Sequence, residues 1–204
     1  MLQQDIKRRI NKLQGNIDEN NQVSSIIGYN AAIFTYLPQH EYFMQKELLE
    51  LLKQYKKTRR YTPPVIGYGF DLTKVLFEYL QSKNELETII EFEEKLYERH
   101  KNPSKSLRFL IDHVLSDVLY EKHNFATYLS EQIRKKIEKN NKHKHTIFIY
   151  MIGGLYPIIR ASSILRYLHS LLQHTYKEQL SLVLFYPGER SDTYGLKFMM
   201  TYRV

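Results

Sequence analysis

Two hydrophobic periodicities alternate along this chain. Short apolar runs rich in β-branched and aromatic residues predict buried strands. Longer stretches, in which apolar residues recur three and four positions apart, predict helices. The expected strands cover residues 31–37, 65–70, 145–152, 182–186 and 196–202. The expected helices cover residues 41–57, 85–100, 104–120, 124–139 and 158–172, together with one within 1–22 and one that follows Asp71.

Turn-forming residues set the expected ends of these elements. Gly15-Asn16 is expected to break the first helix, and Pro187-Gly188 is expected to end the fourth strand. Strands that alternate with helices predict an α/β fold, with a mostly parallel sheet of about five strands flanked by helices. The middle of the chain is expected to be a helical segment. The length of 204 residues fits a single domain over 1–204.

Composition narrows the class of protein. Hydrophobic residues make up 43% of the chain and charged residues 25%, which is the balance of a globular protein. The chain has no cysteine, and this excludes a disulfide framework and thiol catalysis. No apolar run approaches the roughly 18–20 residues that a membrane span needs. The N-terminus has no apolar segment of the signal-peptide type, so a cytoplasmic protein without a membrane role is expected.

The formal net charge is +8, and the basic residues gather in three clusters. One is Lys7, Arg8 and Arg9; another is Lys53, Lys56, Lys57, Arg59 and Arg60; the last contains Arg134, Lys135, Lys136, Lys139, Lys142 and Lys144. Such clusters contact nucleic-acid phosphates in some proteins, so DNA is a possible partner. They are also typical of solvated helix faces and helix ends. The sequence leaves both interpretations open.

In open α/β sheets, ligands bind beyond the carboxyl ends of the strands. Three segments are expected at that edge: 69–71, 153–157 and 186–189. The pair Gly153-Gly154 either binds an anion at a helix N-terminus or provides a tight turn and close packing. Arg160 either holds a phosphate or a carboxylate of another protein, or forms an internal salt bridge. The candidate binding residues are Gly153, Gly154, Tyr156, Arg160, Tyr186, Pro187, Gly188 and Glu189.

No complete catalytic motif accompanies these segments. The phosphate-loop string Gly-x-x-x-x-Gly-Lys-Ser/Thr and the dinucleotide string Gly-x-Gly-x-x-Gly are both missing. No histidine spacing fits a zinc hydrolase, and Gly-x-Ser-x-Gly is also missing. Asp71, Glu189 and Asp192 are carboxylates near strand ends, but nothing in the sequence fixes them as metal ligands. We therefore expect no catalytic residue, no metal and no cofactor; a degenerate nucleotide-binding domain is the enzymatic alternative.

Four strings carry a resemblance to a known family. They are residues 29–38 (YNAAIFTYLP), 152–160 (IGGLYPIIR), 184–189 (LFYPGE) and 195–198 (GLKF). Their order and spacing resemble those of the BrxB family of the bacterial BREX phage-defence system, over nearly the whole chain. The resemblance implies a non-enzymatic scaffold subunit of an antiviral complex. It further implies that a PglZ-like protein is the partner, with a PglX-like methyltransferase working beside it.

Overall fold

Four parallel strands form the centre of the computed structural model, in the spatial order β1-β4-β3-β2. Their bounds are Ala31–Tyr36 for β1, Val65–Asp71 for β2, Lys144–Tyr150 for β3 and Leu180–Ser191 for β4. A short fifth strand, β5 (Gly195–Phe198), pairs antiparallel with the end of β4. The structure describes residues 3–20, 23, 30–57, 65–103, 105, 108, 125–140, 143–155, 161–176, 179–191 and 195–198. The expected α/β fold with a mostly parallel sheet is confirmed.

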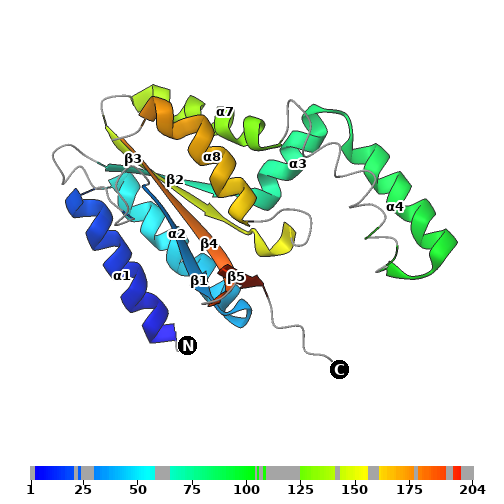
Figure 1. Cartoon of the computed structure of the whole chain (residues 1–204), viewed down its shortest axis with the longest axis horizontal. Helices are drawn as coiled ribbons and strands as arrows, with labels where there is room; N and C mark the ends of the chain where they lie inside the picture. Colours follow the sequence, from blue (N-terminus) through cyan, green and yellow to red (C-terminus); the bar gives the residue numbers. More distant parts are fainter. Residues whose placement is uncertain are drawn as a thin grey trace.

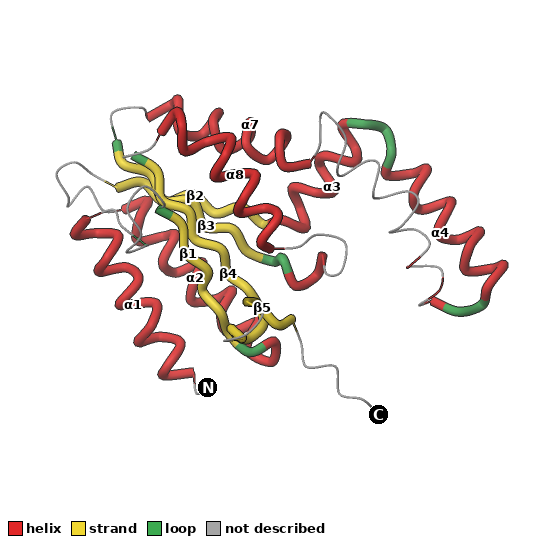
Figure 2. Tube along the Cα trace, viewed as in Figure 1, coloured by secondary structure: helices red, strands yellow, loops and turns green. Residues whose placement is uncertain are grey.

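Helices cover both faces of the sheet (Figures 1 and 2). On one face lie α1 (Gln3–Asn20) and α2 (Glu41–Lys57). On the other lie α3 (Leu72–Ser82), α7 (Phe125–Ile137) and α8 (Ala161–Tyr176). The helix α4 (Leu86–His100) extends away from the sheet in Figure 1. Short 3-10 turns at Pro38–His40, Glu138–Asn140 and Gly153–Leu155 complete the described elements.

The order of the strands explains why the helices divide between two faces. After β1, the chain crosses through α2 to the opposite edge of the sheet and forms β2. It then returns one strand at a time, through α3 and α7 to β3 and through α8 to β4. Parallel crossovers are almost always right-handed. Reversing the direction of travel therefore moves the later helices to the other face.

Each face of the sheet has its own hydrophobic core. Phe148 and Phe185 point toward α1 and α2, where they meet Met44 and Leu48. The neighbouring residues of the same strands point the other way, toward α3, α7 and α8. Residues 145–149 of β3 and 181–185 of β4 are almost completely buried, because these two strands have neighbours on both sides and helices on both faces. Within them, the continuous apolar runs 147–149 and 182–185 are typical of central parallel strands.

Two expected boundaries are wrong. The helix α1 continues through Gly15 to Asn20, and nothing lies within 4 Å of the place where a Gly15 side chain would begin. The strand β4 continues through Pro187-Gly188 to Ser191. Pro187 faces Tyr36 in the last pair of the β1 ladder, and from Gly188 onward β4 pairs with β5 instead. The proline, which has no N–H, thus lies where the strand changes its neighbour.

The remaining expectations on secondary structure hold approximately where the residues are described, with shifts of a few residues at the ends; 158–160 of the expected last helix and 199–202 of the expected last strand lie outside the described residues. The expected helix over 104–120 lies almost entirely outside the described residues. None of the helices in the described part of the chain has the length and hydropathy of a membrane span.

Candidate functional site

The carboxyl ends of β2, β3 and β4 meet at one edge of the sheet. The Thr73 hydroxyl, at the start of α3, donates a hydrogen bond to the Met151 carbonyl oxygen at 3.2 Å. Gly153, just beyond β3, lies against Pro187 of β4. The structure therefore brings together the described parts of the three segments that were expected at this edge, 69–71, 153–155 and 186–189.

Gly153 provides close packing between two of these segments. A Cβ atom at this position would lie 2.6 Å from Pro187 Cγ, closer than real carbon contacts allow. At Gly154, by contrast, a Cβ would meet Thr73 Oγ1 at 3.6 Å, an ordinary contact, and Gly154 is exposed. Met151, with φ of 62°, makes the sharp turn out of β3. The first glycine of the pair thus has a packing role, and the second lies at the surface.

Asp71 also has a structural role at this edge. Its carboxylate caps α3 by accepting a hydrogen bond from the Lys74 backbone N–H at 3.2 Å. Tyr150, on the neighbouring strand, has a raised pKa because of its burial and, second, because of the negative charge of Asp71. Among the described residues, no three side chains of the metal-binding types gather in one place.

Several predicted site residues are not described. Tyr156 and Arg160, after the Gly153–Leu155 turn, lie outside the described residues, as do Asp192 and, in the second basic cluster, Arg59 and Arg60. The backbones of Lys56, Lys57 and Glu189 are described, as parts of α2 and β4, but their side chains are not. Tyr186, Pro187 and Gly188 are buried in β4. The binding role expected of Arg160 stays a prediction.

All three basic clusters make contacts within the protein; in the second, Lys53 pairs with Glu50 at 2.6 Å. In the first, Lys7 lies 3.4 Å from Glu47, Arg8 pairs with Asp5 at 2.7 Å, and Arg9 lies over the Phe34 ring at 4.5 Å.

The third cluster divides between a buried and an exposed part. Arg134 on α7 is half-buried and donates a hydrogen bond to the Leu171 carbonyl of α8 at 2.6 Å. Arg134 therefore joins two helices, while Lys135, Lys136 and Lys139 are exposed and present charge to solvent.

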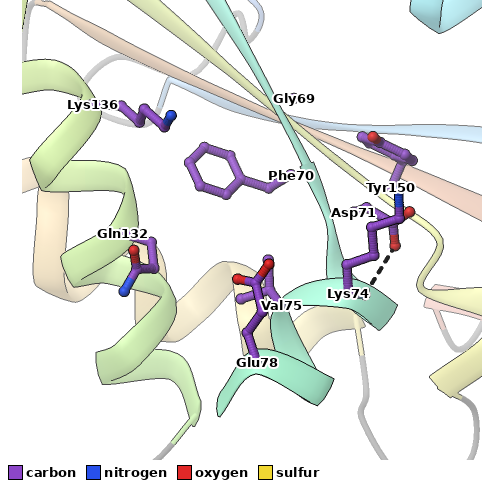
Figure 3. Close-up of a pocket in the computed structure, with 9 residues that line it drawn as sticks. All are labelled: Gly69, Phe70, Asp71, Lys74, Val75, Glu78, Gln132, Lys136 and Tyr150. Carbon is purple, nitrogen blue, oxygen red and sulfur yellow. Dashed lines mark hydrogen bonds between the residues drawn. The ribbon is translucent and has the colours of Figure 1, made fainter. Parts of the chain in front are cut away.

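A groove of about 350 Å³ at the outer edge of β2 was not expected from the sequence (Figure 3). It lies between α3 and α7, beside the end of β2. Its lining consists of Gly69, Phe70, Asp71, Lys74, Val75, Glu78, Gln132, Lys136 and Tyr150. Gly69, Phe70 and Asp71 form one of the three segments expected at the carboxyl edge, and Lys136 belongs to the third basic cluster. Gly69 was the available signal, because a glycine inside a strand often marks a close approach.

Comparison with known proteins adds two findings. Residues 68–203 match the family described as BREX protein BrxB, a range that includes all three segments of the carboxyl edge. The chain is also 24% identical, over 170 residues, to a protein of Bacillus cereus (strain H3081.97) named BREX protein BrxB; the match covers 83% of this chain and 75% of that protein. No solved structure is significantly similar to the chain.

Proposed function

The chain belongs to the BrxB family of BREX phage-defence proteins, and from this membership we propose that it is a non-enzymatic accessory subunit that binds a PglZ-like component. The observation that carries the proposal is the match over residues 68–203, which contains the carboxyl ends of β2, β3 and β4. A PglX-like methyltransferase is the second expected member of the assembly.

The packing at this edge supports a role in binding protein. Gly153 packs on Pro187 and Asp71 caps α3, so both have structural tasks. The hydrogen bond from Thr73 to Met151 holds the start of α3 against the end of β3. Segments fixed to one another in this way form a preorganised surface, which lowers the entropic cost of binding another protein. Gly154 is an exposed residue on this surface.

The first experiment is a pull-down of the tagged chain from cells that carry its native locus. We expect a PglZ-like protein to be recovered, and recovery to persist at high salt. Failure to recover it from cells that express it would contradict the proposal. Recovery of DNA alone, lost as salt rises, would favour the nucleic-acid hypothesis instead, because phosphate contacts weaken steeply with salt.

A pair of glycine variants tests whether the carboxyl edge is the binding surface. Gly154→Gln adds a neutral side chain at an exposed position with room for its Cβ. Gly15→Gln adds the same side chain to open space on α1. We expect Gly154→Gln to reduce recovery of the PglZ-like protein about tenfold, because one poorly accommodated side chain costs about 1.4 kcal/mol or more. Gly15→Gln is expected to leave recovery unchanged. Equal recovery with both variants would move the interface elsewhere.

The alternative of a degenerate nucleotide-binding domain has its own test. The purified chain is heated in the presence of ATP and Mg²⁺, and its melting temperature is compared with that of the chain alone. A non-enzymatic subunit is expected to show no shift, whereas a nucleotide that binds the folded state raises the melting temperature. A concentration-dependent rise would support the alternative of a degenerate nucleotide-binding domain.

A further inference from the structure

Within the described part of the chain, the strand β2 has a neighbouring strand on one side only. All of its residues pair with β3, from Val65 with Lys144 to Asp71 with Tyr150, and no other strand among the described residues pairs with it. Alternate residues of a parallel strand direct their N–H and C=O groups to each side, so part of the β2 backbone faces outward. Edge strands are usually protected by lysine, proline or a bulge. The first six residues of β2, VIGYGF, contain no charge and no proline.

The groove described above lies beside the carboxyl end of this edge strand. Gly69 has no side chain, and a Cβ there would lie 2.6 Å from Leu52 and 3.3 Å from the Tyr150 ring. Leu52 therefore occupies the space over Gly69 on this side, and Tyr150 of the next strand also lines the groove. On the other side it reaches Phe70 and the helices α3 and α7 (Figure 3). The backbone of β2 near Gly69 is thus one wall of the groove, where an added strand would pair.

The two ends of the groove carry opposite net charges. Asp71, Lys74 and Glu78 lie at the α3 end, where two carboxylates and one ammonium give a net charge of −1. Lys136 of α7 lies at the other end, with charge +1, and Gln132 lies between (Figure 3). Lys136 and Glu78 are both exposed, and neither forms a salt bridge with any described residue. A surface with this pattern is complementary to its own copy turned end for end.

We propose that two copies of the chain associate through their β2 edges, antiparallel about a twofold axis. This arrangement extends the sheet across both subunits, and it places Lys136 of each protomer against Glu78 of the other. In such an interface the same surface of both copies is used, so every favourable contact occurs twice. The inference goes beyond the proposed function, since it needs no other member of the defence complex.

The test measures the mass of the full chain in solution by light scattering over a range of concentrations. At about 100 µM we expect twice the chain mass of 24.5 kDa, falling toward the monomer on dilution. Lys136→Glu and Glu78→Lys are each expected to weaken dimerisation about tenfold, because each places two pairs of like charges across the axis. The variant that carries both substitutions is expected to recover the dimer. Lys135→Glu makes the same charge change at the adjacent exposed position outside the groove, and is expected to have no effect.

Hydrogen exchange locates the interface independently of the charges. Amides of residues 65–71 are expected to exchange more slowly at 100 µM than at about 1 µM, because the outward N–H groups become bonded in the dimer. A chain that stays monomeric at 100 µM would overturn the proposal. So would a dimer in which residues 65–71 gain no protection, or one that Lys135→Glu weakens as much as Lys136→Glu.

Discussion

His145 is a completely buried histidine that was not among the candidate site residues predicted from the sequence. It lies at the start of β3, where its ring stacks on Tyr68 with 5.9 Å between ring centres. Burial, together with the charge of nearby His143, lowers the pKa of His145 to about 4 from its ordinary 6.5. The folded state therefore favours the neutral ring. We predict that stability is lost as pH falls from 6.5 to 4, by at most about 3 kcal/mol, measured by urea unfolding at each pH.

A second titrating residue, Glu41, makes the free energy of unfolding depend on pH in the opposite direction. Burial raises the pKa of Glu41, whose carboxylate accepts a hydrogen bond from the Tyr36 hydroxyl at 2.7 Å. A carboxyl with a raised pKa contributes stability at low pH that is lost as pH rises. The variant His145→Phe separates the two effects, because it keeps a ring beside Tyr68 and removes only the titration of position 145. We expect a smaller loss of stability between pH 6.5 and 4 in this variant; an unchanged loss would show that other groups cause it.

At the scale of elements, the sequence predicts whether a segment is a helix or a strand better than it predicts the residues at which that element begins and ends. The expected strand at 65–70 is β2 with one further residue, since β-branched and aromatic residues pack well on a sheet. Local signals failed at Gly15 and Pro187, where tertiary contacts determine the result. The helix α1 continues through Gly15 because apolar residues before and after this glycine are buried in the core on this face of the sheet. They are Ile6, Ile10 and Ile17. The strand β4 continues past Pro187 because β5 replaces β1 as its neighbour.

The contact between Gly153 and Pro187 joins two of the edge segments and gives a prediction at the element scale. We predict that Gly153→Ala lowers the free energy of unfolding by about 1–3 kcal/mol, because its Cβ forces the turn after β3 away from β4. Gly154→Ala is the matched control: its Cβ meets Thr73 at an ordinary distance, so a change within about 0.5 kcal/mol is expected. Both are measured by urea unfolding. Equal losses in the free energy of unfolding would show that both variants act through the conformation of the turn, and not through the contact with Pro187.

For the whole molecule, the sequence predicted the class of fold and the edge that carries the candidate site, but not the order of the strands. Nothing local in 31–36 or 65–71 indicates that these strands are the two edges of the parallel sheet. That order depends on which crossovers bury both faces together. The groove beside β2 was missed for the same reason, because its lining combines residues near 70, 75, 132 and 150. Only the assembled sheet brings them together.

The two cores share the central strands β3 and β4, and this predicts cooperative unfolding of the entire domain. Phe148 packs on α2, while its neighbours Ile147 and Ile149 pack on the opposite face, so neither core survives loss of these strands. Leu48→Ala on α2 and Leu168→Ala on α8 each remove a side chain that is at least 99% buried. We predict that each lowers the free energy of unfolding by about 2–5 kcal/mol and shifts one common transition.

Urea unfolding followed by both far-ultraviolet circular dichroism and tyrosine fluorescence checks this prediction, since the chain has 17 tyrosines and no tryptophan. The two signals are expected to change together in the native chain and in both variants. If Leu48→Ala moved only part of the transition and Leu168→Ala the other part, the two faces would be separate folding units. The β2 edge, which has α2 on one side and α3 on the other, would then have no single rigid frame on which a second copy could dock.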